Sequence, residues 1–203
     1  MLNKKMTSVL LSTIIAASFT SIANAETRTA QATATWQATA IKDTTSMLVV
    51  TPLKSLTFNY AEGQKSFNQQ NGAFDIAIQG LAGATDFKLA SKIVANTLAR
   101  TTDDSKLTVG VKWNGENLNN ATDTVLIDTS KGLTSGLDNL AADGVYNGAD
   151  RATDRGEFTF NIASAESAGS PTDFNSLTDG VWDGDVKVQF TATWDGTFAP
   201  VVP

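Results

Sequence analysis

Apolar residues recur at every second position in short runs along most of this 203-residue chain. Phe74, Ile76 and Ile78 form one such run, and its period of two is typical of a strand with one buried face. Similar runs, separated by Gly, Asn, Asp and Ser, occupy residues 46–53, 56–60, 87–95, 107–113, 124–128, 158–162 and 186–194. Runs of this length and spacing predict an all-β fold, an antiparallel sandwich or barrel.

The run nearest the N-terminus, residues 28–40, alternates in the same way but is built largely from alanine. Alanine is a poor strand former and buries little apolar area, so the strand is thin, with Trp36 as its one large side chain. Two fates stay open on periodicity alone. The segment is an edge strand of its own domain, or it leaves to add a strand to the sheet of another copy.

Turn residues separate the runs. Asn114-Gly115 follows a strand directly and predicts a tight hairpin, because both residues tolerate positive φ. Asp143-Gly144, Asp179-Gly180 and Asp195-Gly196 predict further breaks. Residues 129–156 and 164–180 are rich in Gly, Asp and Ser and predict loops, with one helical turn around residues 137–142. Residues 86–100 could pass for a helix, but Phe87, Leu89 and Ile93 favour a strand to about Ala95.

The first 25 residues have the three parts of a secretory signal. Lys4 and Lys5 precede an apolar stretch, and Ala23-Asn24-Ala25 follows it. The stretch is shorter than the ~20 residues that span a bilayer, which disfavours a membrane anchor. We therefore expect cleavage after Ala25, an extension over residues 26–42, a β-sandwich domain over residues 43–194 and a C-terminal tail over residues 195–203.

Composition narrows the function further. The chain has 15 Lys and Arg against 21 Asp and Glu, so its net charge is −6, and loss of Lys4 and Lys5 with the signal makes it −8. Such an acidic chain repels phosphate backbones and anionic lipid, which argues against nucleic-acid or membrane partners. It has no histidine and no cysteine. This excludes Ser-His-Asp, Cys-His and thiolate-metal sites, so we expect neither an enzyme nor a cofactor.

A few remaining residues could carry chemistry, but each has a plainer interpretation. Asp179, Asp183 and Asp185 could bind calcium, yet they lack the ligand spacing of a calcium loop, and a turn is favoured. Asp103-Asp104 is interpreted as a solvated turn. Trp36, Trp113 and Trp194 are in phase with the apolar faces of their strands and are expected in cores, whereas Trp182 is expected to be partly exposed.

The chain as a whole resembles the major subunits of the enterobacterial common pilus (Ecp/Mat) and, more loosely, the alpha-type chaperone-usher pilins. Residues 29–63, 72–80, 85–98 and 180–194 carry the likeness, which is weaker through the loops of residues 114–156. The resemblance implies an incomplete immunoglobulin-like antiparallel β-sandwich, completed by a donor strand from a neighbouring subunit. It implies a structural pilin that polymerises by donor-strand exchange into surface fimbriae supporting host-cell adhesion and biofilm formation.

The resemblance also implies partners and site residues. The expected partners are other copies in a head-to-tail filament, a periplasmic chaperone, an outer-membrane usher and a tip adhesin, on a route through the periplasm to the cell surface. The implied donor residues, within about residues 29–36, are Ala30, Ala32, Ala34 and Trp36. The implied walls of the acceptor groove carry Leu48, Val50, Val186, Val188, Phe190 and Ala192.

One other function stays open at this stage, a carbohydrate-binding adhesin domain of similar fold. A tip adhesin normally carries a separate binding domain ahead of its pilin domain. The single domain expected here leaves no room for one, so the structural pilin is favoured. A secreted enzyme ranks below both.

Overall fold

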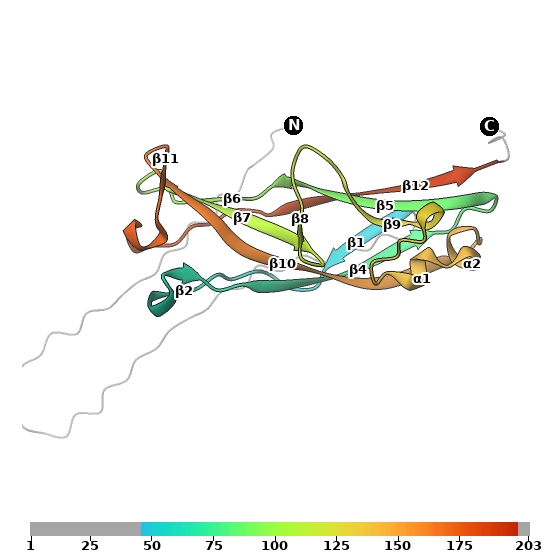
Figure 1. Cartoon of the computed structure of the whole chain (residues 1–203), viewed down its shortest axis with the longest axis horizontal. Coiled ribbons are helices and arrows are strands. Elements are labelled where there is room, and N and C mark those ends of the chain that lie inside the picture. The colour runs from blue at the N-terminus through green and yellow to red at the C-terminus, as the bar shows by residue number, and fades with distance from the viewer. Residues whose placement is uncertain (1–45, 199–203) are drawn as a thin grey trace, which may run out of the picture. The chain divides into compact units, whose positions relative to one another are not determined.

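The computed structural model describes residues 46–198. Two antiparallel sheets pack face to face over one apolar core. The first sheet runs in the order β1 (Leu48–Pro52), β4 (Gln70–Gln79), β10 (Arg151–Ser167), β7 (Lys106–Trp113), β6 (Thr97–Ala99). The second runs β12 (Lys187–Gly196), β5 (Ala84–Ala95), β9 (Thr124–Asp128). Figure 1 shows β12 with β5 in one layer and β4 with β10 in the other.

Short elements complete the chain. β8 (Glu116–Asn117) pairs with β7, β11 (Ser170–Thr172) with β10, and β2 (Tyr60–Ala61) with β3 (Ser66–Phe67). The helical turns are η1 (Glu62–Gln64), η2 (Thr129–Lys131), α1 (Asp138–Ala141), α2 (Asp143–Tyr146) and η3 (Phe174–Ser176). α1 and α2 lie at one end of the sandwich, and β2 and β11 at the other (Figure 1).

The strand order is that of an immunoglobulin domain. Six strands carry the comparison when β9, which adds to the outer edge of β5, is set aside. In chain order they are β1, β4, β5, β7, β10 and β12, and the first sheet joins them as first, second, fifth and fourth. An immunoglobulin constant-type domain has this A-B-E-D sheet, opposed by a C-F-G sheet. The second sheet here has the counterparts of C and F, which are β5 and β12. Within residues 46–198, β12 pairs on one side only, and the edge where G would lie has no strand. The structure confirms the expected immunoglobulin-like all-β sandwich.

The predicted strands mostly appear where the alternation indicated them. β5 ends at Ala95, which confirms a strand rather than a helix over this segment. Asn114 and Gly115 both have positive φ, 48° and 88°, and form the expected hairpin between β7 and β8. The helical turn expected around residues 137–142 is α1, and α2 follows it directly. Trp113 is buried, as expected.

Several predictions were wrong. Residues 56–59 are not a strand, because Pro52 ends β1 and the chain then leaves the sheet. Residues 151–156 and 164–167, expected in loops, belong to β10, and β11 follows within the second predicted loop. Asp143-Gly144 lies inside α2, and Asp195-Gly196 ends β12 rather than following it.

The start of β10 escaped notice because its inward side chains carry no apolar signal. Ala152, Asp154 and Gly156 occupy the inward positions there, so the alternation of residue type is lost although the strand pairs fully with β4. Asp154 is half-buried there, and its carboxylate accepts a hydrogen bond from the amide of Asn139 in α1. A strand can therefore continue where tertiary pairing replaces sequence pattern.

The β7–β8 hairpin provides a test of the fold. Gly115 has φ +88° and a Cβ added there would meet nothing within 4 Å, so Gly115→Ala changes backbone strain alone. We expect a loss of about 1 kcal/mol in the free energy of unfolding, measured by chemical denaturation. Gly63→Ala is the matched control, since its Cβ also meets nothing and its φ is not positive. An equal loss in both variants would contradict the turn assignment.

Candidate functional site

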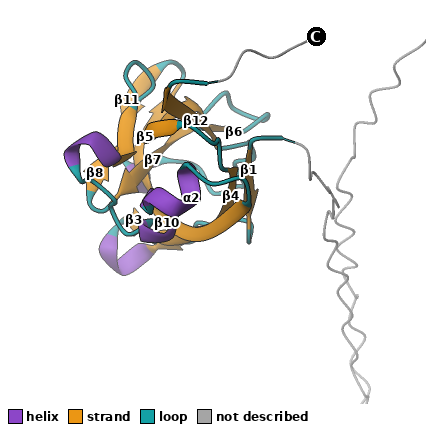
Figure 2. Ribbon diagram, turned by 90° about the vertical axis from the view of Figure 1, so that its right-hand side faces the viewer, coloured by secondary structure: helices purple, strands orange, loops and turns teal. Residues whose placement is uncertain are grey.

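An apolar groove opens along the side of the sandwich between β1 and β12, with a volume of about 1450 Å³. β1 is the edge strand of the first sheet, where Figure 2 shows it beside β4, and β12 is the edge strand of the second. Both edges are unpaired on the groove side within residues 46–198. Buried unpaired backbone groups and exposed apolar surface are both costly, so such a groove is suited to receive another chain segment.

Aromatic rings from β4 and β10 form the floor of the groove. Phe74, Phe158 and Phe160 line it from the first sheet, and Phe190 lines it from β12. Phe190 lies 5.1 Å from Phe74 and 5.8 Å from Phe158, measured between ring centroids. The two sheets therefore touch through these rings, and the core below them is continuous.

The end of the groove near β2 and β11, called the aromatic end below, has a wall made of Phe67, Phe174 and Trp182. Phe67 makes edge-to-face contacts with Phe174 at 5.6 Å and with Trp182 at 6.3 Å. Leu56 and Phe58, on the segment predicted as a strand, also line this end. The alternating apolar residues of this segment therefore line the groove and do not form a strand.

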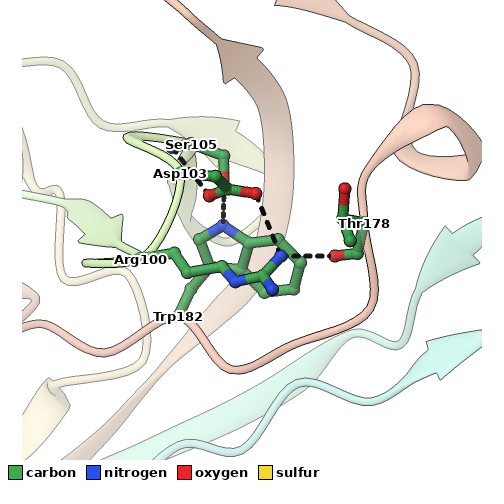
Figure 3. A network of polar contacts seen from close by, with 5 residues as sticks. All are labelled: Arg100, Asp103, Ser105, Thr178 and Trp182. Carbon is green, nitrogen blue, oxygen red and sulfur yellow. Dashed lines mark hydrogen bonds and ion pairs between the residues drawn. The ribbon is translucent and has the colours of Figure 1, made fainter.

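A polar network fixes Trp182 from behind (Figure 3). The guanidinium of Arg100 lies 5.6 Å from the centroid of the Trp182 ring, donates to the carbonyl of Thr178 at 2.7 Å and pairs with Asp103 at 3.1 Å. The indole Nε1 of Trp182 donates to Ser105 Oγ at 2.8 Å, and that hydroxyl donates to Asp103 Oδ1 at 2.7 Å. The side chains of Arg100, Asp103, Ser105 and Trp182 are thus all joined by polar contacts, which hold the segment of residues 178–183 in one position.

The same segment is also bound through its backbone. Ala99 and Asp183 exchange two hydrogen bonds, of 2.9 and 3.0 Å. A Cβ at Gly184 would lie 2.5 Å from the carbonyl oxygen of Thr97, so only glycine allows this close approach. The wall beside β6 is therefore preformed.

The inward face of β12 is only partly buried. Its inward residues Val188, Phe190, Ala192 and Trp194 alternate with exposed polar ones, yet none of them is fully buried. On β5, its neighbour, Phe87, Leu89 and Ile93 are at most 6% exposed. The inward apolar side chains of β12 therefore remain partly exposed to the groove.

Four of the six predicted acceptor residues line the groove, and two do not. Val50, Val186, Val188 and Phe190 line the groove. Leu48 and Ala192 are half-buried against the core beyond its lining. Ala30, Ala32, Ala34 and Trp36 lie outside the described residues.

Sequence reasoning missed the aromatic end of the groove. Phe67, Phe174 and Leu177 lie in segments with little or no alternation, so only their apolar character could have marked them. Trp182 was expected to be partly exposed, and it is half-buried. Trp194 is also half-buried, less than a core residue, because it belongs to the uncovered face of β12.

The acidic residues near the groove lie on the protein surface. Asp179, Asp183 and Asp185 are exposed, and Asp185 pairs with Lys187 at 3.6 Å. Within residues 46–198 no three acidic side chains gather in a way that could hold a metal ion. Asp103 and Asp104 lie at an exposed turn, as expected, and the Asp103 carboxylate is in addition bound by Ser105 and Arg100. In the same part of the chain no helix is long and apolar enough to cross a membrane.

Comparison with known proteins identifies the class. The family model described as fimbrillin MatB matches residues 29–194. The common pilus major fimbrillin subunit EcpA of Escherichia coli strain UTI89 is 50% identical over 194 residues, covering 94% of this chain and 93% of that protein. EcpA of Klebsiella pneumoniae strain 342 is 52% identical over 176 residues, covering 85% and 90%. A solved structure of the CooA pilin subunit from enterotoxigenic E. coli has a TM-score of 0.47 at 19% identity, covering 73% of this chain and 90% of that one.

The match to the fimbrillin family and to these major pilus subunits makes this chain, with its apolar edge groove, a pilin, a structural subunit of a surface fimbria. The chain belongs to the MatB fimbrillin family, that of the common pilus major subunits. Fimbrillins are structural pilus proteins and not a class of enzyme.

The network behind Trp182 gives one prediction. Arg100→Ala removes the cation–π contact and the hydrogen bond to Thr178, and we expect a loss of about 2 kcal/mol in stability together with faster amide exchange at Ala99 and Asp183. Hydrogen exchange followed by mass spectrometry measures the second effect. Arg155→Ala, which breaks a more exposed ion pair with Asp75, is the control and should leave that exchange unchanged. Unchanged exchange in Arg100→Ala would contradict the role given to the network.

A second prediction concerns acid. Hydrogen bonds from the Ser105 hydroxyl and amide, and then the charge of Arg100, hold the pKa of Asp103 below its ordinary value of 3.8, although partial burial opposes them. Because the folded pKa is lowered, the contribution of Asp103 to stability is present above pH 3.8 and is lost as pH falls through the folded pKa.

Denaturation at a series of pH values tests this. The stability difference between the wild type and Asp103→Asn should be largest near neutral pH and should shrink below pH 3.8. Thr102→Asn, in the same turn, changes no titratable group and should differ from the wild type by a constant amount. A constant difference for Asp103→Asn as well would contradict the prediction.

Proposed function

We propose that this chain is a major pilin that polymerises head to tail by donor-strand exchange. The N-terminal segment of one subunit, residues 26–42, enters the groove of the next and pairs with its free edges. The proposed acceptor residues are Leu48, Val50, Val186, Val188, Phe190 and Ala192, and the proposed donor residues are Ala30, Ala32, Ala34 and Trp36.

One observation carries this proposal, the uncovered inward face of β12. Its apolar residues alternate as in a buried strand but are only half-buried, and its outer edge has no partner within residues 46–198. That edge is the position of the seventh strand in an immunoglobulin domain. A strand added there would satisfy the backbone groups of β12 and cover its apolar side chains in one step.

The composition of residues 28–40 fits the strand that is needed. The segment has the required period of two, and it presents alanines on one face and threonine or glutamine on the other. Small side chains enter a folded groove with little repacking of the residues already there. Backbone hydrogen bonds then supply much of the attraction, since they do not depend on the size of the side chains.

Such a contact explains how a chain without cysteine forms a durable fibre. Release of the inserted strand requires the acceptor core to open again, so the contact is long-lived even if its equilibrium free energy is modest. The donor and acceptor surfaces are different patches of the same subunit. A heterologous contact of this kind, when it does not close into a ring, produces a filament.

The route to the surface follows from the same chemistry. Residues 1–25 serve as a cleaved leader into the periplasm, where the uncovered groove needs a temporary partner. A periplasmic chaperone would cover it, an outer-membrane usher would catalyse the exchange, and a separate tip adhesin would begin the fibre. Many repeated subunits then support adhesion to host cells and biofilm formation through multivalent weak contacts.

A charge on the donor strand tests the proposal. Ala32→Asp would bury an unpaired carboxylate in the groove, so we expect loss of fibres, seen by electron microscopy, with a monomer that remains folded by circular dichroism. Thr33→Asp, on the outward side of the same strand, is the matched control and should still form fibres. Normal fibres from Ala32→Asp would overturn the proposal.

A further inference from the structure

We propose that the C-terminal tail of one subunit binds the aromatic end of the groove on the next subunit of the fibre. The tail includes the motif Pro-Val-Val-Pro at residues 200–203, and its partner is the rim around Tyr60 and Val181 of a second copy of this chain. Residues 195–203 lie beyond the match to the family model, which ends at residue 194. This inference rests on the proposed function, because it takes consecutive subunits as joined by their N-terminal segments, and it adds a second contact between them.

The start of the tail is built into the end of the sandwich that carries α1 and α2, called the helical end here. The amide of Thr197 donates to the carbonyl of Gly83 at 3.2 Å, and Thr85 Oγ1 donates to the carbonyl of Asp195 at 3.2 Å. Gly83 has φ +93°, and a Cβ there would lie 2.6 Å from the carbonyl oxygen of Thr197, so this close approach requires glycine. Phe198, the last residue that the structure describes, is 39% exposed. The rest of the tail therefore leaves from a fixed point at the helical end.

The tail is too short to reach the aromatic end of its own subunit. β12 begins at Lys187, towards the aromatic end, and its ten residues to Gly196 cover roughly 33 Å at the rise of a strand. Residues 199–203 span at most about 18 Å when fully extended. A tail bound at the aromatic end therefore belongs to another copy.

The groove is open at its aromatic end and closed towards the helical end. On β12 its lining extends from Lys187 to Phe190 and no further. Beyond that point Trp194 packs on Phe87 at 5.2 Å, and Phe87 packs on Tyr146 of α2 at 6.1 Å, measured between ring centroids. A segment that lies in the groove and is still joined to its own domain therefore leaves through the aromatic end.

The fibre then brings the tail to the aromatic end of the neighbour. The inserted segment joins its own domain at the helical end, where the amide of Gln79 donates to the carbonyl of Met47 at 2.8 Å. The proposed function places residues 26–42 in the groove, so residues 43–47 separate the two domains and span at most about 18 Å. Residues 199–203 leave the same end of the domain with the same reach. The tail can therefore cross the junction beside the N-terminal segment.

The aromatic end has the surface that a proline-rich segment binds. Proline fixes φ and favours extended backbone at the residue before it, so residues 199–203 are expected to lose little entropy on binding. Extended proline-rich segments bind grooves that are lined with aromatic rings. Here Tyr60 contacts Phe67 edge to face at 5.4 Å. Phe67 also contacts Phe174 and Trp182, so the four rings form one continuous surface.

Part of this surface stays exposed beside an inserted strand. Tyr60 follows β1 in the chain and Val181 precedes β12, so both lie beyond the strand edges that the N-terminal segment would pair with. Their side chains are 38% and 71% exposed. Within residues 46–198 the Tyr60 hydroxyl has no hydrogen-bond partner. A bound tail would cover both side chains, and one of its carbonyls would accept from this hydroxyl.

Disulfide trapping in fibres tests the contact, because the chain has no native cysteine. Fibres of the Val181→Cys, Val202→Cys double variant, oxidised by dissolved oxygen, should give a ladder of covalent multimers on a denaturing gel without reductant. The matched control is Thr191→Cys with Val202→Cys, because Thr191 is exposed on the outward side of β12, away from the aromatic end. The control fibres should give monomers.

The outcomes separate this contact from the proposed function. A ladder from the Val181→Cys pair alone supports the contact. Fibres without a ladder, or equal ladders from both pairs, would overturn it and leave donor-strand exchange standing. If the unmodified mature chain forms no fibres, the proposed function itself is wrong.

Fibre dissociation in guanidinium, followed by light scattering, measures the strength of the contact. Removal of residues 199–203 should speed dissociation about tenfold, because buried apolar area is lost. Tyr60→Ala should have a similar effect in full-length fibres but change the rate less than about twofold in fibres that lack residues 199–203. Leu133→Ala, at another apolar side chain that is 39% exposed, is the control and should not change the rate. Equal effects of Tyr60→Ala with and without the tail would contradict the contact.

The prolines are tested in the same assay. Pro200→Ala combined with Pro203→Ala keeps the two valines but removes the rings and the extended preference of the backbone. We expect this variant to dissociate nearly as fast as fibres without residues 199–203. A rate equal to that of the wild type would overturn recognition of the proline motif.

Discussion

The inward face of β12 has a neighbouring strand on one side only, and most features of this molecule follow from that asymmetry. β5 pairs with β12 along its length, but the opposite edge of β12 leaves a row of apolar side chains half-covered. β1 lies across the gap as the edge of the other sheet. The fold thus provides both borders of the groove, and in the proposed function a segment of another subunit fills the space between them.

Side-chain contacts within the chain fix both ends of the groove. At the end near α1 and α2, Phe87 stacks on Tyr146 and contacts Trp194 at a tilt, so the core there closes with the chain's own side chains. At the other end the Arg100 network fixes the wall around Trp182. A site whose two ends are preorganised loses less entropy when a strand enters than a groove whose walls must first be ordered.

The sequence predicted the fold class well because long alternating runs such as residues 107–113 carry a local signal. It also predicted that Val50, Val186, Val188 and Phe190 would share a surface, with the help of the family resemblance. It did not predict the aromatic end of the groove, because Phe67 lies far from Phe174 and Trp182 in the chain and meets them only through tertiary contacts. The start of β10 was missed for a related reason, since Ala152, Asp154 and Gly156 show no apolar period.

β1 has a mechanical consequence in a filament joined in the proposed way. It begins at Leu48, shortly after the N-terminal segment that would be held by the neighbouring subunit, and it borders the groove that would hold the next one. Tension along the fibre would therefore enter each subunit through this strand. Because the hydrogen bonds of β1 to β4 lie across the strand direction, an axial pull loads them together in shear instead of peeling them apart singly. The ladder that shapes the groove would also be the element that resists stretching.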